Sequence, residues 1–129
     1  MKKENRLLKN KDFKNVLDAR SSVSCGEFII YTQKNNLDHS RIGISVSSKI
    51  GNSVVRHKIK RQISEMIKEL FDVKQNIDMV IIVRKNFLKN DFSKNKDILN
   101  KMLLKKFWKG KYYEKNKDIY SSFVFNNYN

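Results

Sequence analysis

Six basic side chains lie within a stretch of the sequence, residues 39–64, that contains no acidic residue. They are Arg41, Lys49, Arg56, Lys58, Lys60 and Arg61. In a helix, Arg56 lies one turn from Lys60, so these like charges repel each other and do not help the helix to form. Because the stretch has no carboxylate to neutralise them, the pattern indicates that they bind an anion from outside the chain. The alternative is a solvated helix face, which is the usual meaning of a charged run.

A helix start next to these cations favours the anion-binding interpretation. Gly51, Asn52 and Ser53 stand where the helix is expected to begin, and its first backbone N–H groups and dipole attract phosphate. Asn52 is a candidate for an RNA contact or for the helix cap, and the sequence alone leaves both roles open. His57 lies among cations, which disfavours a metal-binding or general-base role for it.

Side chains that could cleave a phosphodiester do not gather in this stretch. Metal-dependent cleavage requires clustered carboxylates, whereas the nearest ones, Asp38 and Glu65, only flank the basic residues. His39 and His57 are far apart, and the single cysteine, Cys25, can form neither an internal disulfide nor a cysteine-rich zinc site. We therefore expect a binding protein with no catalytic residue and no intrinsic metal.

The composition is strongly basic: 28 Lys and Arg against 13 Asp and Glu give the 129 residues a formal net charge of +15. This charge favours a polyanionic partner, most commonly nucleic acid. A genome bias toward Lys explains part of the excess, because only six of the 28 basic residues are Arg. The longest purely apolar run, residues 79–83, is too short to span a bilayer. With a single cysteine as well, we expect a cytoplasmic protein.

The hydrophobic pattern predicts the elements that must position these residues. The expected helices are a short one capped by Asn10 and longer ones at about 53–71 and 93–108, and the expected strands are 27–34, 41–47 and 77–83. Within strand 41–47, Gly43, Ser45 and Ser47 share a small, polar face that suits a surface groove. The order helix-strand-strand-helix-strand-helix predicts a single α+β domain over residues 1–109, with helices packed on one sheet. The tail, residues 110–129, has no clear period and is expected to be poorly ordered.

Residues 49–65, KIGNSVVRHKIKRQISE, resemble the signature helix of the protein component of bacterial ribonuclease P. The family pattern is matched at Lys49, Gly51, Asn52, Val54, Arg56, Lys60 and Arg61. The segments Asn5-Arg6-Leu7 and Asp12-Phe13 resemble the N-terminus of that family, and residues 41–47 resemble its second strand. Two positions depart from the pattern, because His57 replaces the usual Asn and Ser64 stands where Arg is common.

The resemblance implies both a fold and a function. The implied fold is an α/β sandwich related to one in ribosomal proteins, with a left-handed connection from the second strand through the signature helix to the next strand. Sequence alone favours a right-handed connection. The implied function is 5′ maturation of transfer RNA, in which an RNA subunit is the catalyst and mainly holds the magnesium. The protein holds that catalytic RNA and the 5′ leader of precursor transfer RNA.

The resemblance also suggests two sets of site residues. The RNA-binding set is Lys49, Asn52, Arg56, His57, Lys58, Lys60 and Arg61. The set for a 5′-leader cleft is Phe13, Leu17, Tyr31 and Ser45, since such clefts bind single strands by stacking and charge. The alternative for the first three is a place in the core. Two other functions stay open: a generic RNA-binding or ribosomal-type protein, and a nuclease with its own active site.

Overall fold

The computed structural model describes residues 1–72 and 74–107, so the predicted tail lies outside the described residues. Its helices are η1 (Lys3–Asn5), α1 (Asn10–Asp18), α2 (Ser53–Leu70), η2 (Lys85–Lys89) and α3 (Phe92–Phe107), where η marks a 3₁₀ helix. Its strands are β1 (Ser22–Ser24), β2 (Phe28–Lys34), β3 (Arg41–Ser45) and β4 (Ile77–Val83). The three predicted helices and three predicted strands are confirmed, and β1 is an addition.

Several boundaries differ from the prediction, most of them by one residue, and two of the differences have a visible cause or consequence. Strand β3 ends at Ser45 instead of residue 47, because the chain then turns toward α2 and the Ser47 hydroxyl accepts a hydrogen bond from the Lys49 N–H at 3.1 Å. Asn10 is the first residue of α1 and not its cap. Lys9 occupies the cap position and makes no side-chain cap bond.

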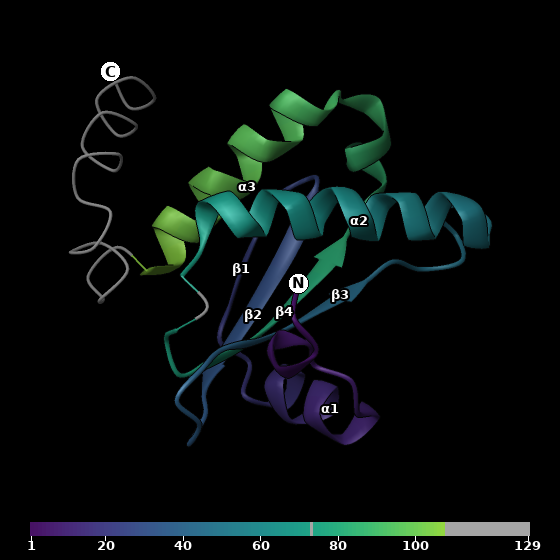
Figure 1. Ribbon diagram of the computed structural model, residues 1–129. Helices are drawn as coiled ribbons and strands as arrows, with labels where there is room; N and C mark the ends of the chain where they lie inside the picture. Colours follow the sequence, from purple (N-terminus) through teal and green to yellow (C-terminus); the bar gives the residue numbers. More distant parts are fainter. Residues whose placement is uncertain (73, 108–129) are drawn as a thin grey trace.

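The strands form one sheet in the order β1-β2-β4-β3. Strand β2 pairs antiparallel with both β1 and β4, whereas β3 pairs parallel with β4. The parallel pair requires a crossover, and α2 provides it. In Figure 1, β3 is the nearest strand, β4 lies behind it and α2 passes above both, so the connection from β3 to β4 is left-handed. The handedness that the family resemblance implied is therefore confirmed.

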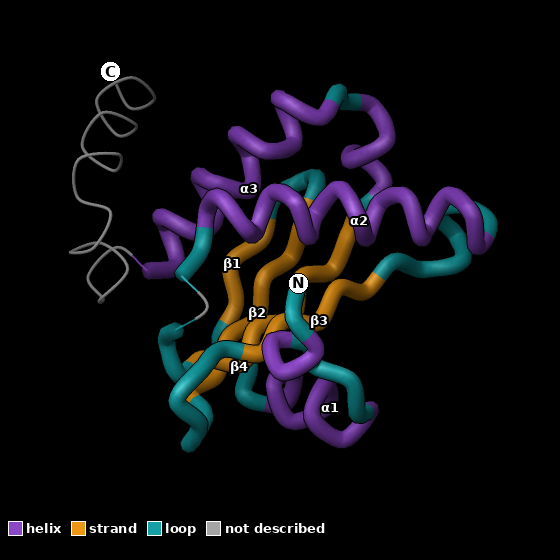
Figure 2. The backbone as a smooth tube through the Cα atoms, viewed as in Figure 1, coloured by secondary structure: helices purple, strands orange, loops and turns teal. Residues whose placement is uncertain are grey.

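The main core lies between the sheet and the helices α2 and α3, which cover the same face (Figure 2). Alternate residues of each strand point to this face, as the period of two requires. The buried residues include Phe28 and Ile30 of β2, Met79 and Ile81 of β4, and Ile63 of α2. Because α2 is fixed to this core by its apolar stripe, its basic side chains are left at the surface.

Among the described residues, α1 is the only α-helix on the opposite face of the sheet (Figure 1). The fully buried part of its contact is small and consists of Leu7, Val16 and Val80. Four further apolar side chains pack against that cluster while remaining partly exposed: Phe13, Leu17, Tyr31 and Ile82. A nine-residue helix therefore leaves part of this sheet face accessible beside it.

The N-terminal segment runs along the outer edge of β3. Arg6 forms a parallel bridge with Ile42, and the Leu7 N–H donates to the Ile42 carbonyl at 3.0 Å. The buried Asn5 side chain donates to the Ser40 carbonyl at 2.8 Å. These bonds satisfy part of an otherwise open strand edge, and they hold the N-terminus between α1 and α2.

Candidate nucleic-acid interface

The start of α2 is organised by two residues of the signature segment. The Asn52 side-chain oxygen accepts a hydrogen bond from the Val55 N–H at 3.0 Å, so the cap role that the sequence left open is confirmed. A Cβ at Gly51 would lie 2.8 Å from Val55 Cγ1, which explains why this position suits glycine. The first turn carries no acidic residue. The helix start therefore attracts anions without competition from a carboxylate of that turn.

Helix α2 presents a polar stripe beside its buried one. His57, Lys60, Arg61 and Ser64 follow the spacing i, i+3, i+4 and i+7, which places them on the same side of the helix. The first three are exposed, whereas Ile59, two residues from both His57 and Arg61 and so on the far side of the helix, is buried in the core. The core packing of α2 thus determines the direction in which these cations point.

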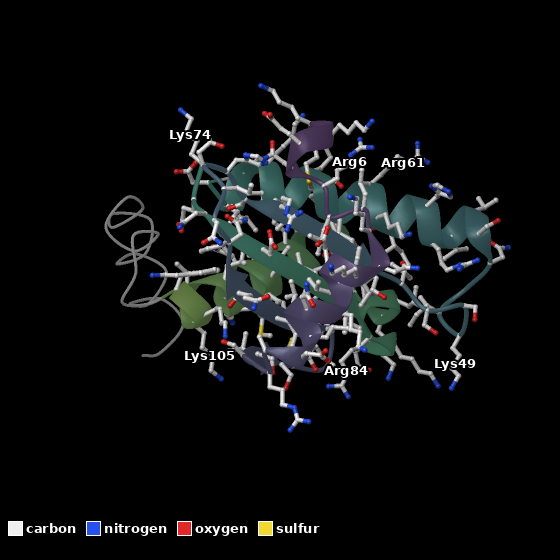
Figure 3. The ribbon with its side chains drawn as sticks, turned by 90° about the horizontal axis from the view of Figure 1, so that it is seen from below. Arg6, Lys49, Arg61, Lys74, Arg84 and Lys105 are labelled. Carbon is white, nitrogen blue, oxygen red and sulfur yellow. The ribbon has the colours of Figure 1, made fainter. Side chains whose placement is uncertain are left out.

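This stripe forms one wall of a groove of about 440 Å³, which we call the basic groove. The other lining residues come from the N-terminal segment, α1 and β3. The lining residues are Met1, Arg6, Leu7, Leu8, Phe13, Ile42, Gly43, Ile44, His57, Lys60, Arg61 and Ser64. Figure 3 shows Arg6 and Arg61 near each other on the same side of the molecule. None of these described lining residues is a carboxylate, so the groove can hold an anionic chain.

The other members of the RNA-binding set lie outside the basic groove. Lys58 is exposed on α2 and, three residues before Arg61, lies about 60° from it around the helix axis, but it does not line the groove. Arg56 is half-buried, and its Nε is buried without a hydrogen-bond partner among the described residues. Lys49 is exposed in the loop before α2 (Figure 3). The structure therefore brings His57, Lys60 and Arg61 together in the groove, whereas Lys49, Arg56 and Lys58 do not line it.

Arg41 is not one of the unpaired cations, although it belongs to the acid-free stretch. Its Nε and one terminal nitrogen donate to the two oxygens of Asp78, at 2.9 and 2.6 Å, and its other terminal nitrogen reaches Asp12 at 3.2 Å. The hydrogen bond with Asp78 raises the pKa of Arg41 above its usual range. Both carboxylates come from outside the stretch, so sequence proximity did not reveal this pairing.

The proposed leader-cleft residues share the sheet face that α1 partly covers. In the sheet, Tyr31 pairs with Val80 and Val80 with Gly43, so these three form one row across β2, β4 and β3. The phenyl ring of Phe13 lies directly on Gly43, where a Cβ would be 2.4 Å from its Cζ atom. The face of β3 that the sequence predicted to be small and polar therefore packs, at Gly43, against the aromatic ring of Phe13.

The next row across the sheet extends this surface. It consists of Ile29, Ile82 and Ser45, of which the two isoleucines are partly exposed and Ser45 is exposed. Phe13 lines the basic groove as well, so the two candidate surfaces meet at this ring. Three of the proposed cleft residues are half-buried: Phe13, Leu17 and Tyr31. Each therefore packs partly against the protein and keeps part of its side chain accessible.

Sequence reasoning missed several residues that the structure adds to these surfaces. Arg6 and the exposed Leu8 line the basic groove, and Ile29 and Ile82 belong to the open sheet face. A signal was present for Arg6, since it is one of only six Arg in a lysine-rich chain. None was available for Ile82, because strand β4 is apolar on both faces.

Two further findings concern residues 1–72 and 74–107. No group of three or more His, Cys, Asp or Glu side chains in this part gathers closely enough to hold a metal ion. None of its helices combines the length and the apolar character that crossing a membrane requires.

The family model and the relatives that match this chain all point to the same family. The family model "Ribonuclease P" matches residues 1–107. The ribonuclease P protein component of Mesoplasma florum is 36% identical over 107 residues, which are 81% of this chain and 97% of the relative. That of Bacillus mycoides is 47% identical over 87 residues, covering 66% and 76% of the two chains.

Solved structures agree with these matches. The ribonuclease P protein of Staphylococcus aureus superposes with a TM-score of 0.69 at 35% identity, and the match covers 77% of this chain and 92% of that one. The protein from Thermotoga maritima gives a TM-score of 0.65 at 30% identity, with coverage of 75% and 94%.

Proposed function

This chain belongs to the ribonuclease P protein component family, and on that basis we propose how it takes part in 5′ maturation of transfer RNA. Its partners are the catalytic ribonuclease P RNA and precursor transfer RNA. The RNA subunit supplies the catalysis and holds most of the magnesium, while the protein binds both RNAs. The setting of this reaction is the cytoplasm.

The basic groove is the observation that carries this proposal. It places Arg6, Lys60 and Arg61 around one hollow, next to an α2 start that favours phosphate. Lysine and arginine around a groove bind nucleic-acid backbones through phosphate without reading sequence. We assign this groove, with Lys49, Asn52, Arg56 and Lys58 around the helix start, to RNA backbone contacts.

We assign the sheet face that α1 partly covers to the 5′ leader, and we call it the leader surface. Phe13 and Tyr31 offer aromatic faces at the surface, and Leu17 and Ile82 add apolar contact area. Single-stranded nucleic acid binds such surfaces by stacking beside a positively charged groove, and Phe13 belongs to both. This combination suits a leader that passes from the sheet face into the basic groove.

The first prediction tests the division of labour between protein and RNA. Nuclease-treated protein alone should leave precursor transfer RNA uncleaved. Together with a ribonuclease P RNA it should lower the magnesium concentration needed for 5′ cleavage. The measurement is a magnesium titration of cleavage with RNA alone, protein alone and both.

Each contrary outcome has a distinct meaning. Clean 5′ maturation by the protein alone would indicate an active site of its own. Binding of structured RNA without any change in the magnesium requirement would indicate a generic RNA-binding protein.

The second prediction concerns the leader surface. Phe13→Ala and Tyr31→Ala should each weaken binding of precursor transfer RNA by about 1–3 kcal/mol per unstacked base. Mature transfer RNA has no leader, so its affinity should barely change. Leu17→Phe adds a π face to the same surface and should tighten precursor binding. The measurement is the dissociation constant of the reconstituted enzyme for both forms.

A matched aromatic control is available on the other side of the sheet. Phe92, at the start of α3, is exposed, so Phe92→Ala removes a surface ring far from the leader surface. Circular dichroism establishes that each variant is folded. Equal losses for precursor and mature forms, or unfolding of both alanine variants, would assign Phe13 and Tyr31 to the core.

A further inference from the structure

Helix α1 needs an attachment to the sheet beyond its small apolar contact. It is nine residues long, and helices this short are marginal on their own in water. It has no side-chain cap at its start, and its fully buried contact with the sheet is limited to Leu7, Val16 and Val80. Its position on the sheet is therefore sensitive to any polar link between the two.

Such a link exists between α1 and two strands. Arg41 of β3 donates two bonds to Asp78 of β4 and one, from its remaining terminal nitrogen, to Asp12 of α1. The Asp78 side chain is 8% exposed and also accepts from the Asn35 side chain at 2.8 Å, so it is fixed within the sheet. Asp78 thus orients the guanidinium, which then presents a fixed donor to α1.

The ion pair between Asp12 and Arg41 joins α1 to β3, as does the contact between Phe13 and Gly43. Asp12 is next to Phe13 on α1, and Arg41 is two residues before Gly43 on the same face of β3. The ion pair between Asp12 and Arg41 therefore lies next to the contact between the Phe13 ring and Gly43. Two adjacent contacts of different kinds fix both the distance and the rotation of the helix.

We propose that Asp12 and Arg41 are positioning residues for the leader surface: their ion pair holds α1 so that Phe13 presents its ring to the RNA. This inference rests on the proposed leader surface. Neither residue needs to touch RNA in this role. Asp12 acts through Phe13, and Arg41 acts through Asp12.

A positioning role for Asp12 and the negative charge of Asp12 predict opposite changes in RNA affinity when this side chain is removed. Asp12 is an acidic residue beside an RNA-binding surface, so by charge alone its removal should strengthen binding of the RNA backbone. If Asp12 positions Phe13, its removal should weaken leader binding instead. The sign of the change therefore discriminates between the two.

The experiment measures affinities of the reconstituted enzyme for precursor and mature transfer RNA. Asp12→Asn and Asp12→Ala should weaken precursor binding, the alanine variant by roughly three- to tenfold, and leave mature transfer RNA unchanged. Asp18→Asn removes an exposed carboxylate from the other end of α1 and should not weaken precursor binding. Tighter or unchanged precursor binding by both Asp12 variants would overturn the proposal.

A double-mutant cycle separates this proposal from the one on which it rests. Once Phe13 is alanine, Asp12→Ala should cause no further loss, because there is no ring left to position. Additive losses would overturn the positioning role. If Phe13→Ala itself fails to discriminate precursor from mature transfer RNA, the leader surface is wrong. If only the Asp12 variants fail to do so, the positioning role alone is wrong. Thermal unfolding of each variant shows whether α1 has stayed in place.

Discussion

Replacing Lys60 and Arg61 together with alanine should weaken binding of the ribonuclease P RNA by roughly 25- to 60-fold at 0.1 M salt. The estimate follows from counterion release, in which each lost phosphate contact lowers the salt slope by about 0.7–0.9. Over the decade from 1 M to 0.1 M salt, two contacts then amount to about 1.4–1.8 logarithmic units of affinity. The measurement is the dissociation constant at several salt concentrations.

Lys60 and Arg61 test RNA binding more cleanly than Arg56 does, because they lie at the surface. Lys60 and Arg61 are exposed and line the basic groove, so their truncation should leave the core of α2 unchanged. Arg56 is half-buried with its Nε out of contact with solvent, so its replacement would mix folding with binding.

Two controls separate a local contact from the overall charge. Lys101→Ala with Lys105→Ala removes the same charge from exposed positions of α3 (Lys105 is shown in Figure 3) and should change the salt slope little. Lys58→Ala removes one cation of α2 that does not line the groove, and it should weaken RNA binding less than the loss of Lys60 and Arg61. If the α3 pair costs as much affinity as the α2 pair, RNA binding depends on net charge and the groove has no special role.

The second large effect concerns stability. Asp78→Ala should lower the free energy of unfolding by about 3 kcal/mol, near the lower end of what breaking a buried ion pair costs. The variant leaves the Arg41 guanidinium without its two shortest bonds and deprives the Asn35 amide of an acceptor. The loss is expected at the lower end because Arg41 is 25% exposed and keeps its bond to Asp12. Urea denaturation followed by circular dichroism measures the change.

Matched variants test whether the ion pair is the cause. Asp97→Ala removes an exposed carboxylate from α3 and should change stability by less than about 0.5 kcal/mol. Combining Asp78→Leu with Arg41→Met should recover much of the loss, because no uncompensated charge is then left in the sheet. A stability of Asp78→Ala within 1 kcal/mol of the original chain would show that Arg41 is adequately held without it.

Much of the fold could be predicted from local patterns. The alternation in residues 28–34 and 41–45 assigned side chains to the two sheet faces, and the apolar stripe of residues 59–70 identified the buried side of α2. These patterns follow from the periods of 2 and 3.6, which depend only on neighbours along the chain. The short strand β1 escaped prediction because three residues are too few to show a period.

The sequence by itself also determined that a basic helix begins at a glycine-asparagine turn, and it identified the family. Only the tertiary structure decided which cations share a groove and which are neutralised. Arg41 looked unpaired within its acid-free stretch, yet its main partner is 37 residues away on the neighbouring strand. Likewise Phe13 and Gly43 meet only because α1 folds back across the sheet. A period specifies the face on which a side chain lies, but the register between strands and the packing of helices determine its neighbours.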